Sequence, residues 1–140
     1  MSIRISGGCL CGAVRYEGTT EPVVQGHCQC RDCQRASGTG HISIMAVPEA
    51  DIAVSGDLKF YDKPADSGNK VRRGFCPNCG SSVLSKNDAM AGMLFLMAGC
   101  LDDPSQLEPA VVVYTDRGHR WDHMDPSLTT FPGMPPRMPG

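Results

Sequence analysis

The sequence predicts a mainly β protein of one domain, residues 1–140, with only short helical turns. The length is close to that of an ordinary single domain and allows one modest hydrophobic core. Apolar stretches are short and alternate with glycine, proline and other turn-forming residues, which is typical of strands joined by tight connections. Seven of the eight cysteines fall into three close groups, which indicates that metal ions cross-link this core.

The first half of the chain contains two expected strands and one expected helix. Residues 13–17 alternate apolar and polar side chains, which predicts a strand directly after a Cys-x-Cys pair. Residues 31–36 are predicted to form one or two helical turns that end at Gly38. Residues 42–47 predict another strand, closed by Pro48 because proline cannot donate a ladder hydrogen bond.

A hairpin is expected in the middle of the chain. Residues 52–54 and 58–61 are short runs with strand-forming side chains. The turn formers Ser55, Gly56 and Asp57 separate them, so we expect the two runs to pair with each other.

The second half continues the pattern of short strands. Residues 93–98 form a continuous apolar run, which predicts a central strand, and residues 111–114 predict the last clear strand. Residues 102–107 predict a short helix because aspartates directly precede Pro104. Residues 122–140 hold five of the 11 prolines and three of the eight methionines, so we expect an irregular tail over the surface of the domain.

Charge and hydrophobicity limit the partners of this protein. The formal net charge is −2, which gives no electrostatic reason to expect nucleic acid or an anionic membrane as a partner. The longest apolar tract, residues 89–101, is interrupted by glycines and is too short to span a bilayer. Residues 1–6 lack the apolar core of a signal peptide, so we expect a cytoplasmic, reducing location. Clustered thiols in such a compartment indicate metal or redox chemistry.

One group of three thiols is the candidate catalytic site: Cys28, Cys30 and Cys33. Three thiolates on a short loop can bind zinc and leave the fourth tetrahedral position to water or to a substrate sulfur. An open position is what distinguishes a catalytic zinc from a structural one. Three other side chains are alternative fourth ligands, namely Cys100, His27 and His41. Cys100 follows an apolar run, which is more typical of an inert buried thiol.

The two remaining cysteine pairs are the candidate structural site. Cys76 and Cys79 form a Cys-Pro-x-Cys-Gly turn between two short strands, which is typical of a zinc knuckle. Cys9 and Cys11 are flanked by glycines that let the backbone wrap around one ion. Together the two pairs predict a closed four-thiolate zinc site, and the count for the chain is two zinc ions.

Three motifs in this order carry a family resemblance. They are GCLCGAVRYE at residues 8–17, CQCRDCQRASG at residues 28–38 and RGFCPNCGSS at residues 73–82. The set resembles the glutathione-dependent formaldehyde-activating enzyme family, which includes centromere protein V-like proteins. The resemblance implies a small β-tent fold of twisted antiparallel sheets. It also implies the same division of the seven cysteines into a structural and a catalytic zinc site. The residue between the first two catalytic thiols is often histidine in that family and is Gln29 here.

The function that the resemblance implies is that of a zinc-dependent carbon–sulfur lyase. The reaction would be that of an S-hydroxymethylglutathione synthase or related thiol and aldehyde chemistry, so the expected partners are a glutathione-like thiol and an aldehyde. Four arginines are candidates for pairing the carboxylates of glutathione, namely Arg31, Arg35, Arg72 and Arg73. Asp32 is a candidate for orienting a metal ligand.

Two other hypotheses remain open. The chain can be a non-catalytic, zinc-stabilised binding module, with the tail methionines Met124, Met134 and Met138 as an adaptable contact surface. Alternatively, the candidate catalytic thiols can act as a disulfide relay, since their oxidation would release zinc.

Overall fold

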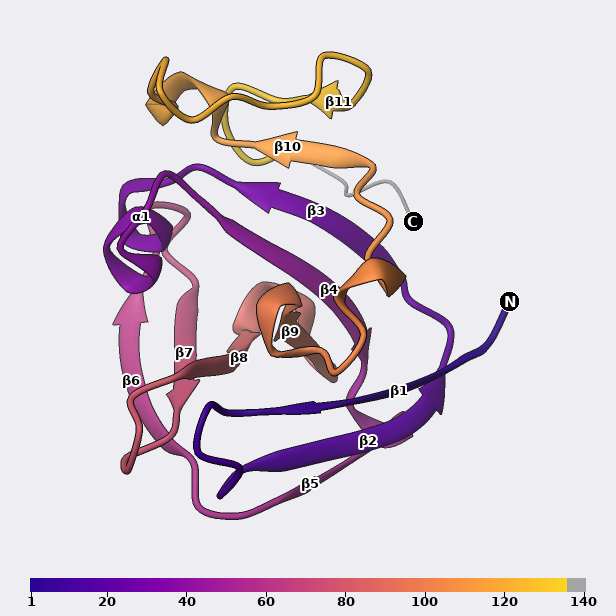
Figure 1. Ribbon diagram of the computed structural model, residues 1–140. Coiled ribbons are helices and arrows are strands. Elements are labelled where there is room, and N and C mark those ends of the chain that lie inside the picture. Colours follow the sequence, from indigo (N-terminus) through magenta and orange to yellow (C-terminus); the bar gives the residue numbers. More distant parts are fainter. Residues whose placement is uncertain (136–140) are drawn as a thin grey trace.

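A computed structural model of the protein describes residues 1–135, which form two β-sheets (Figure 1). The smaller sheet has three antiparallel strands in the order β1-β2-β5 and lies at the bottom of Figure 1. These strands are β1 Ile3–Gly8, β2 Arg15–Thr20 and β5 Ile52–Ser55.

The larger sheet has eight strands in the order β11-β10-β3-β4-β9-β8-β7-β6 and curves around the molecule in Figure 1. Its strands are β3 Val24–Cys28, β4 Ile42–Pro48, β6 Lys59–Pro64, β7 Lys70–Phe75, β8 Ser82–Asn87, β9 Met93–Met97, β10 Val111–Val113 and β11 Thr129–Thr130. The mainly β prediction is therefore confirmed. The larger sheet is mixed, because β10 pairs in parallel with both β3 and β11.

Helical structure is short throughout residues 1–135, as expected. The α-helix α1 Arg31–Ser37 ends at Gly38, whose φ of 76° is one that glycine adopts without strain. Five single 3₁₀ turns accompany it: η1 Glu49–Asp51, η2 Asp88–Met90, η3 Ala98–Cys100, η4 Pro104–Gln106 and η5 Thr115–Arg117. The Asp103 side chain caps η4, which confirms the predicted short helix. No helix among the described residues has the length and apolar character that crossing a membrane requires.

The predicted hairpin at residues 52–61 is wrong. β5 pairs with β2 in the small sheet, whereas β6 pairs with β7 in the large one. Gly56 packs so closely on the first sheet that an added Cβ would lie 2.0 Å from the carbonyl oxygen of Ala13. The turn at Gly56 therefore connects the small sheet to the large sheet. β5 and β6 do not pair with each other, and each pairs with another strand.

The sequence patterns also missed three strands. β1 and β3 precede the two cysteine loops, and β11 lies within the tail that was expected to be irregular. β11 extends the sheet because its Phe131 amide donates to the carbonyl of Val112. Met138, one of the proposed contact residues, lies outside the described part of the chain.

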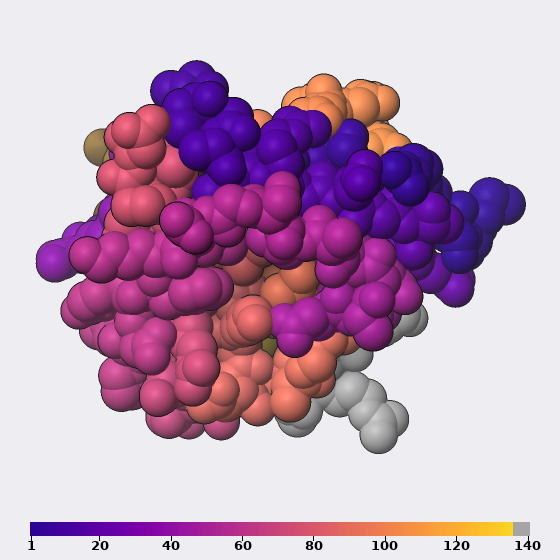
Figure 2. Space-filling model, turned by 90° about the horizontal axis from the view of Figure 1, so that it is seen from below, coloured from indigo at the N-terminus to yellow at the C-terminus, as the bar shows by residue number. Residues whose placement is uncertain are grey.

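The main core lies between the two sheets. It contains alternate residues of the strands, because successive side chains of a strand point to opposite faces of the sheet. On β9, Leu94 and Leu96 point into this core, whereas Phe95 points to the opposite face of the large sheet. On one side of the molecule the indigo N-terminal strands adjoin the magenta residues that follow, and orange residues are visible between the magenta ones near the centre (Figure 2). The opposite face of the large sheet carries a second, smaller cluster that contains Val24, Ile44, Ala46 and Val111, and the candidate site lies on that face.

Candidate metal centre

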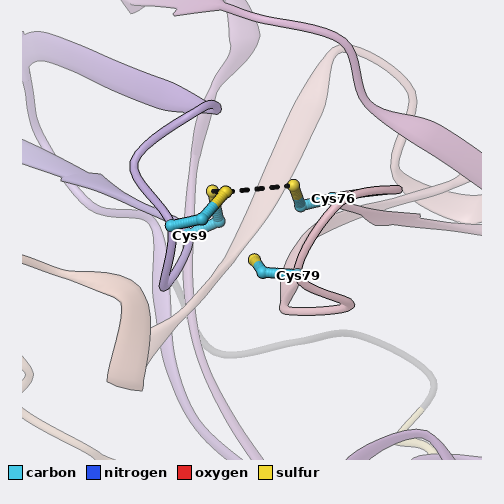
Figure 3. A group of neighbouring side chains, drawn as sticks. Cys9, Cys76 and Cys79 are labelled. Atoms are coloured by element: carbon cyan, nitrogen blue, oxygen red, sulfur yellow. Dashed lines mark hydrogen bonds between the residues drawn. The ribbon is translucent and has the colours of Figure 1, made fainter.

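The structure brings together Cys9, Cys11, Cys76 and Cys79, whose sulfurs all lie within 4.8 Å of one another. The first pair comes from the β1–β2 loop and the second from the β7–β8 turn, and their side chains point toward a common centre (Figure 3). The Sγ–Sγ distances are 3.6 Å for Cys9–Cys11 and 3.7 Å for Cys11–Cys76. A tetrahedral zinc with Zn–S bonds of about 2.3 Å requires sulfurs about 3.8 Å apart, so this donor set fits zinc.

Nearby polar groups favour the thiolate form in this cluster. The Val14 amide donates to Cys9 Sγ at 3.2 Å and lowers the pKa of that thiol. Ser81 contacts Cys79 Sγ at 3.2 Å and, with its own amide, lowers the pKa of Cys79 to about 5. Metal binding requires thiolates, so these contacts reduce the free energy needed to deprotonate the ligands at neutral pH.

The second cluster consists of Cys28, Cys30 and Cys33, again with all sulfurs within 4.8 Å of one another. Cys28 ends β3, and Cys30 is the N-cap of α1. The Cys33 amide donates to Cys30 Sγ at 3.3 Å, so the first turn of the helix places both sulfurs on the same side.

Electrostatic coupling dominates this three-thiol cluster. Hydrogen bonds from the thiols of Cys28 and Cys33 lower the pKa of Cys30 to about 2. The same hydrogen bond raises the pKa of Cys28, because it stabilises the protonated Cys28 thiol that donates to Cys30, and repulsion between neighbouring thiolates adds to this effect. A single thiolate in this cluster is therefore stable without a cation, whereas three thiolates together require a bound cation. A divalent, thiolate-binding metal ion meets this requirement.

None of the three alternative fourth ligands is part of this cluster. The half-buried Cys100 thiol donates to the carbonyl oxygen of Ser82 at 3.2 Å. His27 Nδ1 lies 2.7 Å from Ser43 Oγ, and His41 Nδ1 lies 2.8 Å from Asp122 Oδ1. The protein thus supplies three clustered ligands here and four at the other centre.

Asp122 organises the residues behind the three-thiol cluster, and sequence reasoning missed it. Its carboxylate accepts hydrogen bonds from His41 Nδ1 and from Gln29 Nε2, the latter at 3.1 Å. Gly40 permits this approach, because an added Cβ would lie 2.3 Å from the Asp122 side chain. The contact joins the tail to the cysteine loop across 93 residues of sequence, so no local pattern could have indicated it.

We expect Asp122→Ala to lower the free energy of unfolding by about 2 kcal/mol, because it leaves the buried Gln29 amide and the His41 ring without an acceptor. The Asp122 side chain is only 9% exposed, so water replaces the lost contacts poorly. Urea denaturation of the zinc-loaded protein measures this loss. Asp125→Ala is the matched control, because Asp125 is exposed in the same tail and caps only Ser127; an equal loss in both variants would contradict the prediction.

A cavity of about 650 Å³ opens beside the three-thiol cluster. Of the four candidate arginines, Arg31 and Arg73 line it, whereas Arg35 and Arg72 do not. Arg72 instead faces Asp62 at 4.0 Å. Asp32 lines the cavity but accepts a hydrogen bond from Lys63 at 2.6 Å, so its carboxylate is engaged away from the thiols.

Tyr114 is a further lining residue that the sequence did not single out. The predicted strand at residues 111–114 ends at Val113, and Tyr114 adopts a left-handed conformation with φ of 60°. Burial raises the pKa of its phenol, and the negative charges of Cys28 and Cys30 raise it further. Strained backbone of this kind concentrates at functional sites, and Tyr114 lines the same cavity as the three thiols.

Comparison with known proteins identifies both a family and a fold. Residues 4–117 match the family described as glutathione-dependent formaldehyde-activating enzyme. A solved crystal structure of a Rhodobacter sphaeroides protein is similar in fold, with a TM-score of 0.57 and 19% sequence identity over 90% of this chain and 98% of that one. No curated protein matches the chain.

Proposed function

Because this chain belongs to the glutathione-dependent formaldehyde-activating enzyme family, we propose that it is a zinc-dependent carbon–sulfur lyase. The proposed reaction joins a thiol and an aldehyde, RSH + CH₂O → RSCH₂OH, or reverses that addition. In the family's named activity the thiol is glutathione and the aldehyde is formaldehyde. The observation that carries the proposal is the three-thiol cluster on the wall of a cavity, beside a separate four-thiol centre.

The proposal assigns a structural zinc to Cys9, Cys11, Cys76 and Cys79 and a catalytic zinc to Cys28, Cys30 and Cys33. The sulfur spacing of the first group supports the structural assignment, because it matches a tetrahedral edge. A cluster of three supports the catalytic assignment, because it leaves a coordination position for substrate. Zinc bound there would hold a substrate thiol as its thiolate and act as a Lewis acid.

The chain's own residues supply charge and protons around that centre. The pKa of Cys30 is lowered mainly by hydrogen bonds from Cys28 and Cys33, and the nearby charge of Arg73 adds to this lowering. The Arg73 guanidinium can therefore stabilise the oxygen that becomes negative when the carbon–sulfur bond forms. The Tyr114 hydroxyl can donate a hydrogen bond to the same oxygen. Asp122 binds the Nδ1–H of His41, which leaves Nε2 as the acceptor for a proton from the entering thiol.

The test combines metal analysis with magnetisation-exchange NMR, since the uncatalysed addition is already easy. We expect two zinc ions per chain and faster exchange between ¹³C-formaldehyde and its hydroxymethyl thioether, with glutathione or with mercaptoethanol as the thiol. Free Zn²⁺ at the same concentration is the control. Exchange no faster than in this control, with both thiols, would overturn the lyase proposal and favour a non-catalytic zinc module.

A further inference from the structure

Strand register places an apolar surface directly beside the three-thiol cluster. Three rows of paired residues share this face of the large sheet. The first row contains Val113, Cys28 and Ile42. The second contains Val111, Gly26, Ile44 and Met97. The third contains Val24, Ala46, Phe95, Ser85 and Arg73. A ligand whose sulfur lies at Cys28 would therefore place its remaining atoms over the second and third rows.

This surface is apolar and only partly covered by the described part of the protein. Phe95 and Met97 are half-buried, although their strand neighbours Leu94 and Leu96 are fully buried in the core. A cavity of about 650 Å³ with such a lining lies within the size range of about 300–1,000 Å³ for small-molecule pockets.

The charges of the lining are few and mostly engaged. Among the described residues, the lining has two arginines, Arg31 and Arg73, two histidines, His27 and His41, and two carboxylates, Asp32 and Asp66. Asp32 is bound by Lys63, Asp66 is bound by Arg117 at 2.8 Å, and Arg31 contacts the side chain of Gln34. Neither arginine makes an ion pair within residues 1–135, but Arg31 is hydrogen-bonded to the neutral Gln34 side chain, whereas the Arg73 guanidinium makes no side-chain hydrogen bond there. Arg73 is therefore the cation that is available to a ligand anion.

We infer that the cavity takes a thiol with an apolar body and at most one anionic group, with its sulfur at the three-thiol cluster and its anion at Arg73. This inference rests on the proposed function and specifies its substrate. Glutathione carries two carboxylates and an ammonium group, and these would lie on Phe95, Met97 and Ile44 with one arginine to pair them. Burial of polar groups on such a surface without partners opposes binding.

Calorimetric titration of the zinc-loaded protein with a series of thiols tests the inference. The series comprises 6-mercaptohexanoate, 3-mercaptopropionate, 1-hexanethiol and glutathione. Each methylene buried on the apolar rows is expected to tighten binding about fourfold. We therefore expect 6-mercaptohexanoate to bind at least tenfold more tightly than 3-mercaptopropionate and than glutathione.

Three variants locate the binding surface. Phe95→Ala and Met97→Gln should each weaken 6-mercaptohexanoate at least fivefold and leave 3-mercaptopropionate within twofold. Arg73→Gln should remove the preference for 6-mercaptohexanoate over 1-hexanethiol. Phe60→Ala is the matched control for Phe95→Ala, since Phe60 is a partly exposed phenylalanine on the edge strand β6, pairs with Gly74 and does not line the cavity.

Cobalt substitution distinguishes the failure of this inference from the failure of the proposed function. A thiol that coordinates Co²⁺ at the three-thiol cluster adds sulfur-to-cobalt charge-transfer absorption. If no thiol in the series changed that absorption, the proposed function would be overturned. If thiols changed it but glutathione bound as tightly as 6-mercaptohexanoate, or if Phe95→Ala and Met97→Gln had no effect, only the apolar-substrate inference would be overturned.

Discussion

The Cys11→Ser variant is expected to lose one zinc ion and to be largely unfolded at neutral pH. Cys11 joins the β1–β2 loop to the β7–β8 turn through its contacts with Cys9 and Cys76. Structural zinc contributes on the order of 10 kcal/mol in small zinc-dependent domains, whereas a whole domain has a net stability of about 5–15 kcal/mol. Loss of this centre would therefore remove most of the stability, as near-ultraviolet circular dichroism and metal analysis would show.

Substitution of Cys11 tests the loss of a metal ligand without the added loss of packing in the core. Cys76 is 1% exposed, so serine at that position would also disturb the core, whereas the Cys11 residue is exposed. Cys100→Ser is the matched control, because it removes a half-buried thiol outside both clusters and should keep both zinc ions and the fold. Cooperative unfolding of Cys11→Ser within about 1 kcal/mol of the parent protein would contradict the structural assignment.

The Cys30→Ser variant is expected to lose the other zinc ion and at least a hundredfold of the exchange rate while the fold remains. Cys30 Sγ caps α1 by accepting from the Cys33 amide, and serine is itself a preferred N-cap residue. The helix should therefore persist, whereas a neutral hydroxyl replaces one of three thiolate ligands. Metal analysis measures the number of bound zinc ions, circular dichroism reports the fold, and NMR measures the exchange rate.

This second prediction also tests the redox alternative. Under that hypothesis oxidation pairs two of the three thiols and releases zinc, so the mass of the untreated parent protein would show paired cysteines and Cys30→Ser would alter that pairing. Retention of both zinc ions by Cys30→Ser, with thiol binding intact, would contradict the catalytic assignment. Cys100→Ser again provides the comparison, since that thiol contacts Ser82 and is outside the three-thiol cluster.

Local sequence determined several parts of this protein. The run at residues 31–36, with Gly38 to end it, was sufficient to predict α1. Continuous apolar runs predicted β4 and β9, and the Cys-Pro-x-Cys-Gly turn predicted the connection between β7 and β8. Each of these features depends on side chains within one turn or one strand, where spacing alone decides which residues share a side. The division of the cysteines into groups of four and three followed from counting ligands, because two cysteine pairs complete one tetrahedral zinc site and leave three thiols.

Only the tertiary structure decided which segments meet. The pairing of β5 with β2 and of β10 with β3 joins residues that are far apart in sequence, and turn chemistry at Gly56 predicted a different partner. The hydrogen bonds of Asp122 to His41 and Gln29, and the apolar rows around Phe95, arise from the same long-range pairing. A period of two shows which side chains share a strand face, but the neighbouring strand and the second sheet decide whether that face becomes the core or a cavity.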